Sequence, residues 1–202
     1  MEESKFYEFV RGHLTVNSGP MFSGKTSVLT ETLNRYADLG FPTLYINSSK
    51  DTRSDKGIST HNSGGNNLSK KVDKLSVQNL SNVDASLLSK FKVIGIDEAQ
   101  FFSGLCNTVL DWVDAQKKIV HVVGLDLYAN RQKWGEIADL FPQADSAFKL
   151  TAKCLDCLDL GQGVIEAPFT SRIVPKGPLE DIGGSDKYLP VCRKHWNIRN
   201  DN

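Results

Sequence analysis

The sequence has no excess of either charge, because 24 lysines and arginines balance 24 aspartates and glutamates over 202 residues. A balanced chain produces no overall field that would hold nucleic acid or an anionic membrane by charge alone. We therefore expect neither a nucleic-acid partner nor a membrane partner.

The sequence also lacks a long apolar run, since none approaches the roughly 20 residues that a membrane-spanning helix needs. The segment from Met1 to Lys5 lacks the basic and apolar regions of a secretory signal. These absences predict a soluble protein of the cytoplasm. In such a reducing compartment, four cysteines are expected to be metal ligands or buried thiols and not disulfides.

What the sequence does contain is an alternation of apolar strands and amphipathic helices. Strands are predicted at residues 13–17, 41–46, 92–97 and 119–125, and helices at residues 25–39 and 105–116. This order is typical of an α/β protein with a parallel sheet and right-handed crossovers. Residues 48–67 are rich in Ser, Asp, Gly and Asn, which predicts a mobile loop or an exposed hairpin.

The loop after the first predicted strand has the spacing of a Walker A motif: Gly19, Pro20, Met21, Phe22, Ser23, Gly24, Lys25 and Thr26. In this motif, glycines let backbone N–H groups curl around phosphate oxygens at a helix N-terminus. Lys25 is then expected to reach the β- and γ-phosphates of ATP, and the Thr26 hydroxyl to bind Mg²⁺. The alternative is an ordinary connection between a strand and a helix.

Two acidic residues end the third predicted strand. Asp97 stands where a Walker B carboxylate that holds the metal is expected, and Glu98 can accept the proton of an attacking hydroxyl group. Phe101 and Phe102 follow, and adjacent aromatic side chains can pack on a flat ring. Without the Walker loop, a solvated acidic turn and plain core would be the simpler interpretation. With it, these residues favour a phosphotransferase site.

Two pairs of candidate metal ligands lie near the C-terminal end: Cys154 with Cys157, and Cys192 with His195. Two residues separate the members of each pair, so each pair can hold one ion from a tight turn. Four such ligands fill a tetrahedron, which predicts a structural and not a catalytic Zn²⁺. Incidental cysteines and a redox CxxC motif are the alternatives. Cys106 lies in a predicted helix and is expected to be a buried thiol.

A metal at these ligands would pin both ends of a long loop, residues 158–191. Loops of this length are usually functional, and glycines near its end, at Gly183 and Gly184, let the backbone approach a ligand. The loop is predicted to cover a second substrate, or else to be a solvent-exposed linker. We therefore predict a P-loop ATP-binding α/β domain at residues 1–150 and a zinc-binding, substrate-covering domain at residues 151–202.

In their order along the chain, these motifs closely resemble those of the type II thymidine kinases of animals, many bacteria and large DNA viruses. The resemblance spans roughly residues 14–195 and includes the segments 50–53, 96–102, 124–126 and 182–188. It implies transfer of the γ-phosphate of ATP to the 5′-hydroxyl of thymidine, in nucleotide salvage. It also implies a homotetramer.

The resemblance further implies roles for single residues. Glu98 matches the general base of the family, while Asp97, Gln100 and Arg53 match its nucleotide site. Met21 and Phe101 match residues that line the thymine pocket. The family's zinc domain carries a loop, the lasso, that holds the base largely through backbone groups and matches Leu179, Glu180, Asp181, Ile182, Gly183 and, beyond it, Tyr188.

One departure concerns the base pocket. The family usually has an aromatic residue three positions after Asp126, whereas this chain has Ala129 there and Tyr128 one residue earlier. Either Tyr128 substitutes for that ring after a shift of the backbone, or the pocket is wider and the base preference altered. Thymidine is the expected substrate, and deoxyuridine or a wider set of pyrimidine nucleosides stays open.

The expected reaction is in-line phosphoryl transfer, which depends on positioning and charge neutralisation more than on covalent chemistry. Two other functions compete with it: an ATPase that binds nucleic acid through its zinc module, and a nucleotide-binding protein without catalysis. The balanced charge argues against the first. The joint presence of Lys25, Asp97 and Glu98 argues against the second.

Overall fold

A computed structural model describes residues 11–50, 68–174 and 177–200. Its centre is a six-stranded sheet in which neighbouring strands run parallel, in the order β3-β2-β4-β5-β1-β6. The strands are β1 (His13–Ser18), β2 (Thr43–Ser48), β3 (Val72–Val77), β4 (Val93–Ile96), β5 (Ile119–Gly124) and β6 (Ser146–Lys149). The predicted α/β class with a parallel sheet is confirmed.

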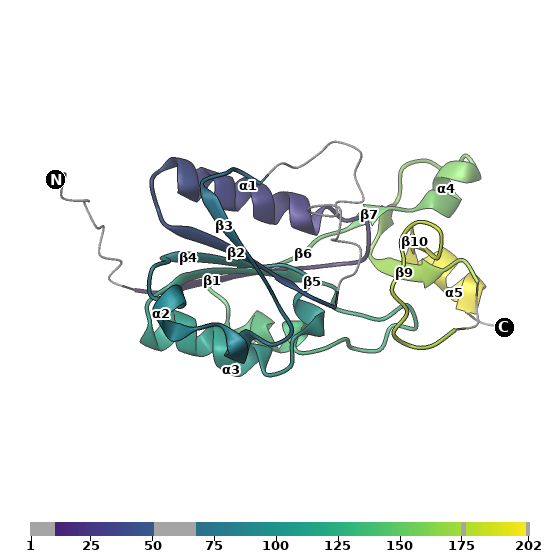
Figure 1. Ribbon diagram of the computed structural model, residues 1–202. Helices are drawn as coiled ribbons and strands as arrows, with labels where there is room; N and C mark the ends of the chain where they lie inside the picture. The colour runs from purple at the N-terminus through teal and green to yellow at the C-terminus, as the bar shows by residue number, and fades with distance from the viewer. Residues whose placement is uncertain (1–10, 51–67, 175–176, 201–202) are drawn as a thin grey trace.

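Helices cover both faces of this sheet (Figure 1). Helix α1 (Lys25–Asp38) lies on one face, and α2 (Ala85–Leu88) and α3 (Leu105–Leu110) lie on the other. Helix α3 continues as a π-helical turn, η4 (Asp111–Ala115), so the predicted helix at 105–116 is present with a change of hydrogen-bond pattern midway. Three short 3₁₀ segments complete this part: η2 (Leu80–Asn82), η3 (Ala99–Phe101) and η5 (Ile137–Gln143).

Helix α1, with 14 residues, is the longest helix in the described part of the chain. Within the described ranges, no helix combines the length and the apolar character that crossing a membrane requires.

The core of the main sheet lies in two clusters, one on each face. Successive residues of β4 alternate between them, because Val93 packs in the cluster under α1, whereas Ile94 and Ile96 pack with α3. Gly95 faces α1, and a Cβ there would come within 2.5 Å of Leu33 Cδ1. Glycine at this position therefore lets α1 pack closely on the strand that leads into the predicted Walker B site.

The remaining elements form a smaller C-terminal unit, residues 152–200, beyond one end of the main sheet (Figure 1). Two antiparallel strand pairs build it, β7 with β8 and β9 with β10. Its elements are β7 (Ala152–Lys153), α4 (Leu155–Asp159), β8 (Glu166–Ala167), β9 (Phe169–Arg172), β10 (Tyr188–Val191) and α5 (Arg193–Asn200). The main sheet ends at Lys149, close to the predicted domain boundary, and the division at residue 150 stays a prediction.

The ends of three central strands bring the sequence motifs together. Ser18 at the end of β1 pairs with Gly124 at the end of β5, and Ile96 at the end of β4 pairs with Val122. The segments that follow these strands therefore emerge at the same edge of the sheet. Open parallel sheets bind ligands at this edge, outside the carboxyl ends of their strands.

Candidate functional site

The predicted phosphate-binding loop forms a tight turn between β1 and α1. Gly19, Phe22 and Gly24 have positive φ angles of 154°, 66° and 80°, and α1 begins directly after Gly24. The ammonium group of Lys25 folds back over the loop and donates a hydrogen bond of 2.6 Å to the carbonyl oxygen of Pro20. The loop thus combines a cation with a helix N-terminus, an arrangement that binds phosphate groups.

Two contacts anchor this loop to distant segments. The N–H of Met21 donates a buried hydrogen bond of 2.9 Å to Thr170 Oγ1 in β9. A Cβ at Gly19 would lie 2.5 Å from the carbonyl oxygen of Leu150, so only glycine allows this close approach. The loop is therefore held between the end of β6 and the C-terminal unit.

The buried carboxylate of Asp97 follows β4 and meets two hydroxyl groups. Tyr45 Oη donates a hydrogen bond of 2.9 Å to Asp97 Oδ2, and the Thr26 side chain is also hydrogen-bonded to Asp97. Burial, and then the charge of Glu98, raises the pKa of Asp97 to about 6, although these hydrogen bonds lower it. Magnesium prefers oxygen ligands, so the paired oxygens of Thr26 and Asp97 fit the predicted metal.

Glu98 comes next and has an unusual backbone conformation. Its φ of 49° and ψ of 43° are left-handed, which is uncommon for a residue with a side chain. Gln100 Nε2 donates a hydrogen bond of 2.5 Å to Glu98 Oε2, while Gln100 Oε1 accepts one of 2.9 Å from the N–H of Leu125. One amide therefore links the predicted base to the end of β5.

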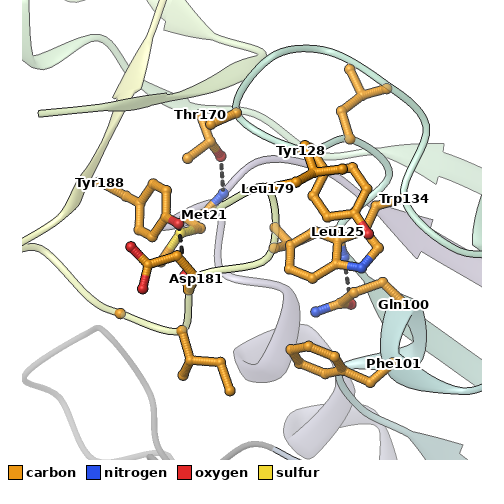
Figure 2. Close-up of a pocket in the computed structure, with 14 residues that line it drawn as sticks. Met21, Gln100, Phe101, Leu125, Tyr128, Trp134, Thr170, Leu179, Asp181 and Tyr188 are labelled. Carbon is orange, nitrogen blue, oxygen red and sulfur yellow. Dashed lines mark hydrogen bonds between the residues drawn. The ribbon is translucent and has the colours of Figure 1, made fainter. Parts of the chain in front are cut away.

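An apolar pocket of about 430 Å³, its open mouth included, lies between this edge of the sheet and the C-terminal unit (Figure 2). Its volume suits a small molecule. Trp134 has a central place in it, because its ring stacks on Tyr128 at 4.3 Å and meets Phe101 edge-on at 5.3 Å. We call these three rings the aromatic wall. The other lining residues are Met21, Gln100, Leu125, Leu127, Ala129, Thr170, Leu179, Asp181, Ile182, Gly183 and Tyr188.

The residues predicted to bind the second substrate all line this pocket, with the exception of Glu180. Glu180 nevertheless acts on it electrostatically, since burial, and then the charge of Glu180, raises the pKa of the Tyr128 hydroxyl. Arg53, predicted on the phosphate side, lies outside the described residues. The roles of all these residues stay predictions.

A hairpin from Asp126 to Trp134 carries the position where the expected aromatic residue is replaced. The N–H of Trp134 bonds to the carbonyl oxygen of Asp126 at 3.0 Å, and the N–H of Tyr128 bonds to that of Gln132 at 2.9 Å. Tyr128 and Ala129 both line the pocket, and the Tyr128 ring stacks on Trp134. This geometry favours the alternative in which Tyr128 takes the place of the ring that Ala129 lacks.

Polar contacts fasten the predicted lasso, residues 179–183, to β9 and β10. Tyr188 Oη donates a hydrogen bond of 2.7 Å to the carbonyl oxygen of Asp181. Lys187 Nζ donates one of 2.6 Å to the Asp181 carboxylate, and Arg172 Nη1 lies 3.8 Å from the same carboxylate. The lasso is therefore held against the pocket by residues on both strands.

The four predicted metal ligands converge in one buried cluster. Cys157 Sγ lies 3.8 Å from Cys192 Sγ, and Nδ1 of His195 lies 3.3–3.5 Å from the three sulfur atoms, the third being that of Cys154. Zinc bonds of about 2.3 Å to sulfur and about 2.0 Å to nitrogen require tetrahedral edges of roughly 3.8 and 3.5 Å. Both the donor set and its spacing therefore fit one Zn²⁺ ion.

Two contacts connect the metal centre with the rest of the molecule. Arg199 in α5 donates hydrogen bonds of 2.7 Å to both carboxylate oxygens of Asp156 in α4, which joins the helices that carry ligands. Trp196 Nε1 donates a hydrogen bond of 2.9 Å to the carbonyl oxygen of Ala129 in the hairpin. Cys106 lies apart from this cluster, and it is only partly buried, whereas a buried thiol was predicted.

Sequence patterns did not single out Tyr45, Trp134 or Thr170. Tyr45 and Thr170 lie inside strands, where tyrosine and threonine are common for reasons of packing alone. Trp134 stands eight residues after Asp126, in a segment without helical or strand periodicity. Thr170 lies in the middle of the predicted loop 158–191, so no nearby motif marks it either.

Comparison with known proteins agrees with the geometry of the site. A family model described as thymidine kinase matches residues 12–196. The chain is 40% identical over 186 residues to "Thymidine kinase a" of Arabidopsis thaliana, which covers 92% of this chain and 75% of that protein. It is 36% identical to the thymidine kinase of Yaba monkey tumor virus (90% and 93% covered) and 36% identical to the cytosolic thymidine kinase of Homo sapiens (91% and 72% covered).

Proposed function

This chain belongs to the thymidine kinase family, and from that premise we propose how its own residues carry out the reaction. As a thymidine kinase, it transfers a phosphoryl group from ATP to thymidine in nucleotide salvage. The assignment of roles rests on one observation. Glu98, next to the Asp97–Thr26 pair, is hydrogen-bonded to Gln100, which lines the aromatic pocket.

On the donor side, the loop from Gly19 to Thr26 holds the triphosphate of ATP. Lys25 exchanges its bond with the carbonyl oxygen of Pro20 for the β- and γ-phosphates, which are stronger acceptors. Thr26 and Asp97 would hold Mg²⁺, which would neutralise charge on the phosphate oxygens.

On the acceptor side, the pocket holds the nucleoside with its 5′-hydroxyl toward Glu98. The base packs against the aromatic wall, and backbone groups of the lasso bind its polar edge. The 5′-oxygen attacks the γ-phosphorus as the bond to the ADP oxygen breaks, and Glu98 receives the hydroxyl proton. The lasso excludes water, so that the phosphoryl group passes to the nucleoside and not to a water molecule.

The test is an ATP-coupled assay with thymidine, deoxyuridine, deoxycytidine and deoxyguanosine. Thymidine should be the best substrate and deoxyuridine the next, because the two bases share their polar edge and deoxyuridine lacks only the methyl group, which an apolar pocket favours. Turnover of none of the four would refute the kinase function. Glu98→Gln should lower kcat by roughly 10² or more while nucleotide binding is kept, and Glu31→Gln on the exposed face of α1 is the matched control.

The assembly and the location of the protein follow the same premise. We propose that the protein works in the cytoplasm, as the word "cytosolic" in the name of the human relative suggests, and that it forms the homotetramer that the family resemblance implies. Exposed apolar side chains support assembly, among them Phe148 on the edge strand β6, with 55% of its surface exposed. Light scattering after size-exclusion chromatography measures the oligomer directly, and a monomeric active enzyme would contradict the tetramer.

A further inference from the structure

The amide of Gln100 is buried between the proposed base and the end of β5. Only 4% of Gln100 is exposed, and both polar atoms of its side chain are used. Nε2 donates to Glu98 Oε2 at 2.5 Å, and Oε1 accepts from the N–H of Leu125 at 2.9 Å. Figure 2 shows the Gln100 side chain beside Leu125 and near Phe101, at the margin of the pocket.

Hydrogen-bond chemistry determines which way this amide points. A flipped amide would set its NH₂ group against the N–H of Leu125, and its oxygen against the Glu98 carboxylate. Two donors would then face each other, as would two acceptors. The orientation with the NH₂ group toward Glu98 is therefore the one that bonds both partners, and it requires Glu98 to be an acceptor.

Two glycines close the backbone around Gln100. A Cβ at Gly124 would lie 2.6 Å from Gln100 Oε1, and a Cβ at Gly135 would lie 2.6 Å from the Gln100 carbonyl oxygen. Gly135 also has a φ of 61°, a conformation that side chains rarely adopt. The end of β5 and the segment after Trp134 thus enclose Gln100 from two sides, which leaves its side chain little freedom.

We propose that Gln100 is a positioning residue that holds the Glu98 carboxylate in place for the acceptor hydroxyl. This proposal rests on the proposed role of Glu98 as base. The Glu98 side chain has several rotatable bonds and follows a turn with left-handed backbone angles, so its carboxylate needs an external partner to stay in one place. Gln100 supplies such a partner from an enclosed position, and its own amide is fixed by the N–H of Leu125 at the end of β5. A displacement of about 1 Å can cost roughly 10²-fold in rate.

The sharpest single variant is Gln100→Glu. It keeps the shape of the side chain and an oxygen for the N–H of Leu125, but it replaces the donor to Glu98 by a carboxylate oxygen. We expect kcat to fall by roughly 10²-fold, with KM for thymidine and for ATP changed by less than about threefold. The neutral variant Gln100→Met should lower kcat in the same direction, which separates lost positioning from added charge.

The matched control is Gln116→Glu. Gln116 Nε2 also donates to a carboxylate, that of Asp111, at 2.8 Å, but the pair lies on the exposed surface. The chemical change is the same at both sites, and only the variant at Gln100 should lower turnover.

A double-variant cycle tests whether Gln100 acts through Glu98. In Glu98→Gln, the base is gone, so adding Gln100→Glu should reduce the residual turnover by no more than about twofold. The double variant can also rebuild the hydrogen bond with reversed polarity, so its melting temperature should recover above that of Gln100→Glu alone. An equal loss of turnover in both backgrounds would overturn the proposal, as would a rise in thymidine KM with kcat unchanged.

The wild-type assay separates this proposal from the function it depends on. If wild-type protein phosphorylates no nucleoside, the proposed function fails. If wild type is active and Gln100→Glu has normal kcat, only the positioning role of Gln100 fails.

Discussion

Tyr45 lies on β2 and Asp97 directly follows the neighbouring strand β4, and the Tyr45 hydroxyl donates a hydrogen bond of 2.9 Å to Asp97 Oδ2. Both residues are buried, with 5% and 4% of their surfaces exposed. Tyr45 pairs in register with Gly95, so the phenol reaches Asp97 along a stretch of sheet that no side chain from β4 occupies. A core tyrosine is thus joined directly to the proposed metal side of the site.

Tyr45→Phe should therefore weaken Mg²⁺ binding. The change keeps the ring but removes one of the hydrogen bonds that lower the pKa of Asp97, so this pKa should rise further above about 6. More of the carboxyl group is then protonated at neutral pH, and the Mg²⁺ concentration for half-maximal activity should rise by roughly threefold to tenfold. Manganese titration followed by electron spin resonance measures the same shift without catalysis. Tyr36→Phe, half-buried on the same face, is the control, and an equal shift in both variants would contradict the role of the hydroxyl.

Asp97 should also make the stability of the metal-free site depend on pH. Its pKa is about 6 in the fold against an ordinary value of 3.8, so the folded state binds more protons between these values. The stability that Asp97 contributes to the folded state is therefore fully present below pH 3.8 and is lost as the pH rises through about 6. Asp97→Asn should abolish this loss, and it should be more stable than wild type at pH 7 by roughly 1–3 kcal/mol while it loses turnover. Denaturant titration of zinc-loaded, Mg²⁺-free protein measures the difference.

His121 should act in the opposite direction over the same range. Burial, and then the charge of His13, lowers the pKa of His121 from 6.5 to about 4, and its buried Nε2 has no hydrogen-bond partner among the described residues. Between these two values the unfolded chain binds more protons than the folded one. The stability that neutral His121 contributes is therefore complete above about pH 6.5 and is lost as the pH falls toward 4. In Asp97→Asn only the His121 effect is left, so stability should rise with pH between pH 5 and 6.5. In His121→Leu only the Asp97 effect is left, so stability should fall with pH over the same range. Parallel curves for wild type and both variants would contradict both assignments.

The part of the fold that could be predicted is the centre of the sheet. The continuous apolar runs of β4 and β5 are typical of strands covered on both faces. The two strands of the main sheet that were not predicted, β3 and β6, are its edges. Most of their residues are at least partly exposed, so these strands lack the continuous apolar run that marks β4 and β5. An edge strand forms because it pairs with a neighbouring strand, and this pairing cannot be read from the local sequence.

For the site, local motifs were predictable and long-range pairings were not. The phosphate loop and the metal ligands have fixed spacings, because backbone turns impose them. The bond from Met21 to Thr170 joins residues 149 positions apart, and the bond from Tyr45 to Asp97 joins residues 52 apart. Such pairs depend on strand order and on the packing of the C-terminal unit, so the aromatic wall and the role of Tyr45 emerge only in three dimensions.

Loss of the metal should affect thymidine more than ATP. Cys157→Ser removes one of four ligands, so α4 and α5 lose the metal between them and keep only the Arg199–Asp156 pair, while the phosphate loop on the main sheet keeps its own core. We expect about one zinc ion per chain in wild type and much less in the variant, with thymidine KM raised roughly tenfold and ATP KM raised less. Metal analysis and steady-state kinetics measure both. Cys106→Ser, outside the cluster, should keep its zinc, and equal losses for both substrates would contradict a role confined to the nucleoside side.

The aromatic wall should decide how tightly thymidine binds, and Trp134 is its centre. Removing this indole in Trp134→Ala takes away a face for the base and also leaves Tyr128 and Phe101 without the ring they pack on. Stacking of a base on an aromatic side chain contributes about 1–3 kcal/mol, so thymidine KM should rise roughly 10–100-fold with little change in ATP KM. Trp134→Phe restores a smaller ring and should recover much of the loss. If Trp134→Ala binds thymidine as tightly as wild type in equilibrium titrations, the base does not rest on this wall, and the lasso backbone must hold it alone.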